Sequence, residues 1–91
     1  MTRAADLQLL MTGFMNGADI SLSAANRLGA LLDEMFPNDA YIQDIVGMLA
    51  QYRPGGGEFL HDTPEVQRKL IRASAYHKGL ALALTNNVRS D

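Results

Sequence analysis

The sequence of residues 62–84 reads DTPEVQRKLIRASAYHKGLALAL, and it predicts one long helix. Asp62 is a favourable N-cap residue, Pro64 suits the first helical turn, and Glu65 places an acid near the positive end of the helix dipole. Beyond this start, apolar residues recur at helical spacing as far as Leu84. A helix over residues 64–84 would have about 20 residues and a length of roughly 30 Å.

This long helix carries two opposed apolar faces. The first face consists of Val66, Leu70, Ala73, Leu80 and Leu84, with Tyr76 and Ala81 at its edges. The second face consists of Ile71, Ala75 and Leu82. A helix in a small domain is not enclosed on all sides, so we expect the second face to pack against another chain. The alternatives are that the N-terminal helix covers this face, or that isolated exposed apolar residues are tolerated there.

Basic residues gather in the same part of the chain. Residues 1–62 contain three basic and eight acidic residues, a net charge of −5, whereas residues 63–91 contain five basic and two acidic residues, a net charge of +3. We therefore predict an interaction surface that consists of Arg68, Ile71, Arg72, Ala75, Lys78 and Leu82. The alternative is a solvated face whose cations pair with acids of the neighbouring helices.

Three further amphipathic helices precede this stretch, over residues 3–16, 22–36 and 39–52. Their expected N-caps are Ser21 or Ser23 for the second helix and Asn38 or Asp39 for the third. Gly17 suits a left-handed position after the first helix, and Pro37 ends the second. Gly29, in the middle of the second helix, predicts the close approach of another helix.

The segment from Pro54 to His61 contains three consecutive glycines and is expected to be a flexible connection. Together these patterns predict an all-α fold: a compact four-helix domain over residues 1–85, with a long C-terminal helix and a flexible tail over residues 86–91. A compact domain of 91 residues has a radius of gyration of about 12 Å.

The composition excludes several classes of protein. Hydrophobic residues make up 47% of the chain, which is too many for a fully disordered protein, and the chain has no cysteine for disulfides or a thiolate zinc site. No apolar run approaches the length of a membrane span, and the first 20 residues lack the uninterrupted apolar stretch of a signal peptide. We therefore expect no membrane association and a cytoplasmic location.

Two histidines are the candidates for chemistry. His61, Asp62 and Glu58 form a weak candidate metal site, although Asp62 is equally explained as a helix cap. His77 lies on the first apolar face. It is either a half-buried core histidine, bonded to a backbone carbonyl or to Tyr41 or Tyr52, or a pH-sensitive group at an interface.

No motif for nucleophilic catalysis or phosphate binding occurs in the sequence, and we expect no cofactor. We predict a small non-catalytic interaction protein, an adaptor, regulator or inhibitor, that self-associates as a homodimer through the helix over residues 64–84. One alternative is a nucleic-acid-associated regulator that uses the basic face of this helix. It is disfavoured, because the net charge is −2 and no aromatics are interleaved with the basic residues. The other alternative is a small metal-dependent enzyme at the loop from Glu58 to Asp62.

Overall fold

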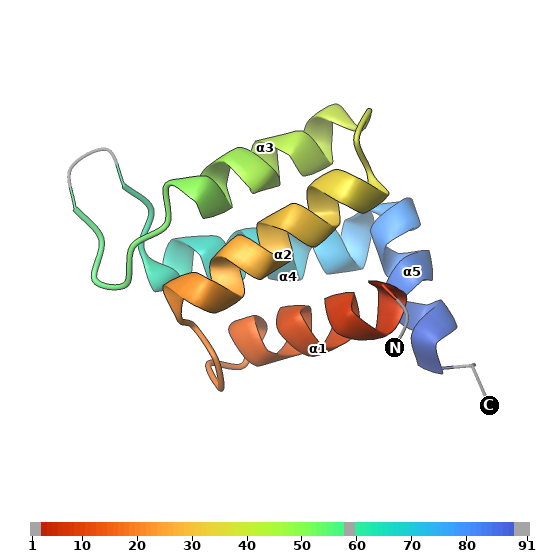
Figure 1. Ribbon diagram of the computed structural model, residues 1–91, viewed down its shortest axis with the longest axis horizontal. Coiled ribbons are helices and arrows are strands. Elements are labelled where there is room, and N and C mark those ends of the chain that lie inside the picture. Colours follow the sequence, from red (N-terminus) through yellow and green to blue (C-terminus); the bar gives the residue numbers. More distant parts are fainter. Residues whose placement is uncertain (1–2, 58–59, 89–91) are drawn as a thin grey trace.

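The computed structural model of this chain is all-helical (Figure 1). It describes residues 3–57 and 60–88, with the backbone alone for residues 85–88. The helices are α1 (Arg3–Met15), α2 (Leu22–Met35), α3 (Ala40–Ala50), α4 (Thr63–Tyr76) and α5 (Lys78–Val88). Within the described ranges, no helix is long and apolar enough to cross a membrane.

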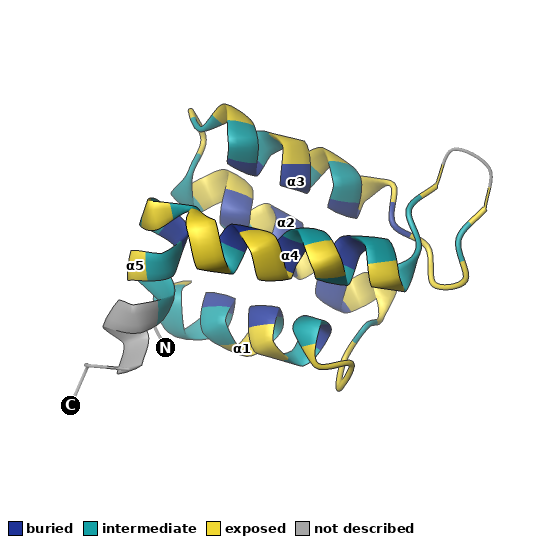
Figure 2. Cartoon of the chain, turned by 180° about the vertical axis from the view of Figure 1, so that it is seen from behind, coloured by how far each residue is buried: buried dark blue, intermediate teal, exposed yellow. Residues whose placement is uncertain are grey.

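Helices α1 to α4 surround a common core, and α5 crosses one end of the bundle. Seen from behind, α4 runs across the front between α3 and α1, and α2 lies on the far side (Figure 2). Helix α5 contacts α4 and α1, and the connection between α3 and α4 projects from the opposite end of the bundle (Figure 1). The outward side of α4 is therefore not covered by another helix.

The expected four-helix arrangement with a long C-terminal helix is corrected by the structure. Residues 64–84 do not form one helix, because the backbone is extended at His77 and separates α4 from α5. Helix α5 also continues to Val88, past the expected end at Leu84. The predicted flexible tail over residues 86–91 thus begins inside α5, and residues 89–91 lie outside the described residues.

The local capping signals are confirmed. The side chains of Ser21, Asp39 and Asp62 accept hydrogen bonds from the backbone N–H three residues later, at 3.1, 3.1 and 3.0 Å. Gly17 follows α1 with a φ of +84°, a conformation that favours glycine. These bonds satisfy backbone groups that the first turn of each helix leaves unpaired, which explains why α2, α3 and α4 begin where they do.

The glycine-rich connection is closed at its base by backbone pairing. Helix α3 ends at Ala50, two residues earlier than expected, so that Tyr52 and His61 can form an isolated bridge. The Arg53 N–H donates to the His61 carbonyl at 2.9 Å, and the His61 N–H donates to the Gln51 carbonyl at 3.0 Å. The Tyr52 hydroxyl also donates to the Ile20 carbonyl, at 2.7 Å. The loop is therefore anchored to the connection between α1 and α2.

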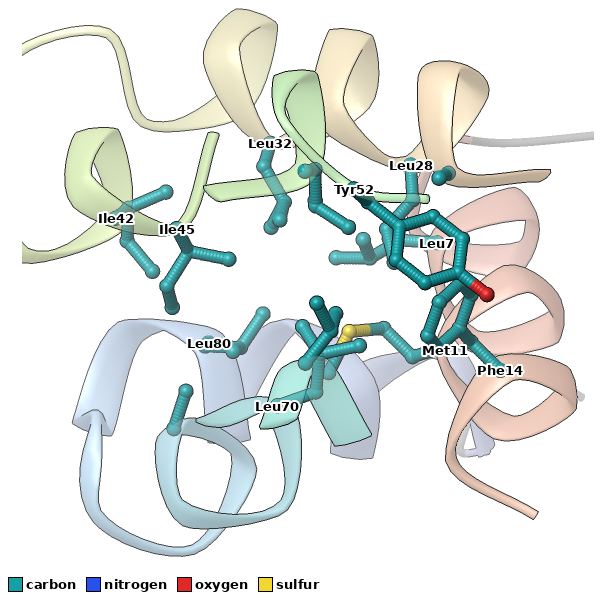
Figure 3. Close-up of a cluster of buried hydrophobic side chains, with 14 residues drawn as sticks. Leu7, Met11, Phe14, Leu28, Leu32, Ile42, Ile45, Tyr52, Leu70 and Leu80 are labelled. Carbon is teal, nitrogen blue, oxygen red and sulfur yellow. The ribbon is translucent and has the colours of Figure 1, made fainter. Parts of the chain in front are cut away.

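The core draws on all five helices, and on Tyr52 (Figure 3). Phe14 of α1 packs edge-on against the Tyr52 ring, with 5.1 Å between the ring centroids. Leu80, although it lies beyond the break at His77, is completely buried. The radius of gyration is 12.4 Å, in agreement with the value expected for one compact unit of this length.

Gly29 provides a first test of the packing. The predicted close approach is confirmed, because a Cβ atom added at Gly29 would lie 3.7 Å from the Leu49 Cβ. That distance is an ordinary contact, so the site has room for a methyl group. We expect Gly29→Ala to raise the free energy of unfolding by about 0.5–1 kcal/mol, because alanine loses less backbone entropy in a helix. Urea unfolding followed by circular dichroism measures this; a loss of stability would show that α2 and α3 are packed more tightly.

Candidate functional site

The outer face of α4 consists of Arg68, Ile71, Arg72, Ala75 and Tyr76, which line a shallow hollow of about 330 Å³. Its apolar side chains are unusually accessible: Ile71 is 51% exposed and Tyr76 is 82% exposed. In Figure 2 the side of α4 that faces the viewer is coloured largely as exposed, with intermediate residues towards the connection with α3. Four of the six residues predicted for the interaction surface are thus brought together here.

Arg68 and Arg72 form a ridge along this face. They lie four residues apart, so their side chains emerge one turn from each other on the same side of the helix. Across the described residues, neither arginine is within ion-pair distance of an acid. On the other side of the ridge, a second hollow of about 230 Å³ is lined by Met48, Glu65 and Lys69.

The three other basic residues of this region are Lys69, Lys78 and Arg89. The Lys69 ammonium lies 4.5 Å from the centroid of the Tyr41 ring, a cation–π contact that ties α4 to α3. Lys78 is exposed but lies beyond the break in the helix, and Arg89 lies outside the described residues. The unpaired positive charge of the outer face therefore comes from Arg68 and Arg72.

Leu82 and Lys78 do not line the hollow at Ile71. Leu82 is 54% exposed, as expected for the second apolar face. However, its predicted alignment with Ile71 and Ala75 assumed a continuous helix, and the helical register is interrupted at His77. Tyr76 is more exposed than expected. The sequence placed it at the edge of the buried face, but it is the most exposed large apolar side chain in the described part of the molecule.

His77 ends α4 and begins α5. Its backbone N–H donates to the Ala73 carbonyl at 2.8 Å, and its carbonyl accepts from the Ala81 N–H at 2.9 Å. Its ring caps the new helix, because Nδ1 accepts from the Leu80 N–H at 3.0 Å. In the neutral ring Nε2 then carries the proton, and it donates to Asp39 Oδ2 at 2.6 Å.

The ring of His77 is also fixed by its aromatic neighbours. Tyr41 stacks on it with an angle of 10° between the ring planes, and Phe36 packs against it edge-on. His77 is therefore a half-buried core histidine, as one of the two hypotheses held, but its partner is Asp39 rather than a carbonyl or a tyrosine hydroxyl. Both ring nitrogens are engaged in hydrogen bonds, so the ring as placed offers no free nitrogen for acid–base chemistry.

Asp39 connects two helix starts. One carboxylate oxygen caps α3 through the Ile42 N–H, and the other accepts from His77. These two hydrogen bonds, with the one from Ile42 the larger cause, lower the pKa of the Asp39 carboxyl below its ordinary value of 3.8.

The pH-sensitive role of His77 itself stays a prediction. Protonation of Nδ1 would remove the cap on Leu80 and at the same time strengthen the attraction to Asp39.

Two residues of the candidate metal site at the loop, His61 and Asp62, have other partners. His61 Nδ1 lies 2.7 Å from Glu65 Oε2, and Asp62 caps α4 through Oδ1. Glu58, the third candidate, lies outside the described residues. In residues 3–57 and 60–88, no group of three or more potential metal ligands is found. The geometry thus accounts for His61 and Asp62 as residues that fix the start of α4.

Asp39 generates a prediction about acid stability. Because its pKa is lower in the folded chain than in the unfolded chain, its stabilising contribution is present above about pH 4 and is lost as the pH falls through the folded value. We expect Asp39→Asn to destabilise the chain at pH 7 and to flatten the loss of stability between about pH 5 and about pH 3. The control is Asp44→Asn, which removes the same charge at an exposed carboxyl of α3, the helix that Asp39 caps. The free energy of unfolding of both variants is measured by urea unfolding at each pH. An equal fall for the two variants between about pH 5 and about pH 3 would contradict this role for Asp39.

Gly79 generates a prediction about the turn. A Cβ atom added there would lie 3.2 Å from Phe36 Cε1 and 3.3 Å from His77 Cε1, closer than an ordinary contact. The His77 ring cannot yield without losing its bonds to Asp39 and Leu80. We expect Gly79→Ala to lower the free energy of unfolding by about 1 kcal/mol, because overpacking outweighs the gain in helix propensity. Urea unfolding beside Gly29→Ala checks the opposite signs; a stabilised Gly79→Ala variant would show that the turn is loosely packed.

No protein-family model matches this chain, and comparisons with curated proteins and with solved structures found no match either.

Proposed function

We propose that this chain is a small non-catalytic interaction protein that binds another protein through the outer face of α4. The observation that carries the proposal is the pairing of exposed apolar side chains, Ile71 and Tyr76, with two arginines that have no acidic partner in the described residues. Tyrosine and arginine are enriched in the residues that dominate binding at protein interfaces. The role is that of an adaptor, regulator or inhibitor.

Another exposed hollow, which lies between α1 and α2 and away from α4, is a weaker candidate for the same role. Leu9 is exposed there, and the hollow has a volume of about 270 Å³. However, its charged side chains are of both signs, with Asp6 and Asp19 close to Arg27. A mixed-sign site gives a charged partner little net attraction, so the outer face of α4 is the better candidate.

Self-association as a homodimer is one form of this proposal. A symmetric dimer through the outer face of α4 would bury Ile71 and Tyr76 of both copies. It would also bring the four arginines of two copies close together, which costs free energy through like-charge repulsion. We therefore place a different protein first and a second copy of the chain next.

Association with nucleic acid is the second candidate function. The two unpaired arginines and the exposed ring of Tyr76 are the features that favour it, because phosphates pair with arginine and bases stack on aromatic rings. The acidic balance of residues 1–62 opposes it. Salt-dependent retention of the purified chain on a nucleic-acid column supports this function, and its absence removes it.

Photo-cross-linking tests the interaction proposal. A benzophenone amino acid replaces Ala75 in the outer face of α4 or, as a matched control, Ala30, an exposed helical alanine on α2 across the bundle. We expect a discrete adduct with another protein in cells of the native host from position 75 alone, and its loss when Ile71→Asp is added. An adduct of twice the chain mass would identify the homodimer.

Two results would contradict the proposal. One is the same pattern of adducts from both positions, and the other is an adduct at position 75 that Ile71→Asp leaves unchanged. Circular dichroism of each variant must show that the helical content is retained, which is expected because Ile71 is half exposed. Loss of folding in Ile71→Asp would place this side chain in the core instead.

A further inference from the structure

We propose that the partner of the outer face of α4 is an amphipathic helix that carries two carboxylates one turn apart, beside a large apolar side chain. This inference rests on the proposed function, since it names the chemistry of the partner at the same surface.

The charge on this face sets the first requirement. Arg68 and Arg72 are separated by four residues, which corresponds to a rise of about 6 Å along α4. Glu65 is the one acid among the residues that line the two hollows; its Oε2 lies 2.7 Å from His61 Nδ1, and it is not paired with either arginine. Two positive groups at this spacing match carboxylates placed three or four residues apart on a facing helix.

The hollow beside the arginine ridge sets the second requirement. Ile71 and Tyr76 border it, and Ala75 between them carries no side chain beyond its methyl group. A small residue in the middle of a helix face allows another helix to approach closely, and its neighbours then pack on either side of the inserted side chain. The hollow of about 330 Å³ is open to solvent and admits an apolar group from the partner.

The shape of the surface favours a helix over an extended peptide. An extended segment that binds through its backbone adds a strand to a sheet edge, which supplies backbone donors and acceptors. Throughout α4, by contrast, the backbone groups of the helix interior are used within the helix. Recognition must therefore come from side chains at helical spacing, as in helix-in-groove binding.

A second copy of this chain fits the requirement poorly. Two of its acids on the helices away from α4 are already engaged: Glu34 pairs with Arg3, and Asp33 accepts from Gln43. A contact between α4 of one copy and α3 of the next would be head-to-tail, and such a contact closes into a ring or continues into an open chain but does not form a symmetric dimer. The partner helix is therefore assigned to a different protein.

Selection from a displayed library tests the inference. The probe is a library of single-helix peptides with randomised exposed positions, selected against the full-length chain and counter-selected against the Ile71→Asp variant. We expect the enriched peptides to share two acidic residues three or four positions apart and an apolar residue next to them. Arg68→Gln or Arg72→Gln is expected to weaken each selected peptide about two- to fivefold, the scale of exposed ion pairs, and added salt to weaken it further.

Arg53→Gln is the matched control, because Arg53 is an exposed arginine of the connection between α3 and α4 and lines neither hollow beside Arg68 and Arg72. Enriched peptides that compete at α4 but lack the acidic pair would overturn the partner chemistry and leave the proposed function standing. Failure to enrich any peptide that distinguishes the chain from Ile71→Asp would overturn both. If a single-stranded oligonucleotide binds at Arg68 and Arg72 and no peptide does, the ligand of this face is nucleic acid and the acidic helix is excluded.

Discussion

The hydrogen bond between His77 Nε2 and Asp39 Oδ2 is the interaction on which the C-terminal half of this structure depends. It holds the His77 ring so that Nδ1 faces the Leu80 N–H, and α5 starts from that cap. With the chain turned at this point, Leu80 enters the core and α5 lies across the end of the bundle instead of extending α4.

Those parts of the fold that depend on neighbouring residues could be predicted from the sequence. Ser21, Asp39 and Asp62 are N-caps because the groups they bond lie three residues away, and the left-handed Gly17 is equally local. The break at His77 could not be predicted in this way. Its side-chain partner is 38 residues earlier, and the alanines and leucines on either side of the break favour an uninterrupted helix. The sequence holds one weak local signal for the break: Gly79 is a poor helix former, and it lies two residues after His77, whose side chain can cap a helix.

The candidate site shows the same division. The periodicity of the sequence placed Ile71 on a second apolar face; in the structure this side chain is exposed, and Arg68 and Arg72 emerge beside it. Leu82 was assigned to this surface by extending one helical register through His77, and the structure interrupts that register. Tyr76 was missed because its place on a helical wheel is at the boundary between faces, where tertiary packing rather than periodicity decides burial.

The length of α4 limits what its outer face can bind. The face extends over residues 68–76, a little more than two turns, and α5 turns away at its end. A helix pair in contact over two turns buries less area than a stable obligate interface, which places binding here among weak, reversible associations. In such an interface the attraction between exposed arginines and carboxylates contributes chiefly to the rate of encounter and to the choice of partner, while apolar contact at Ile71 and Tyr76 supplies the affinity. The Asp39–His77 hydrogen bond, which sets where α4 ends, therefore also sets the size of the surface available to a partner.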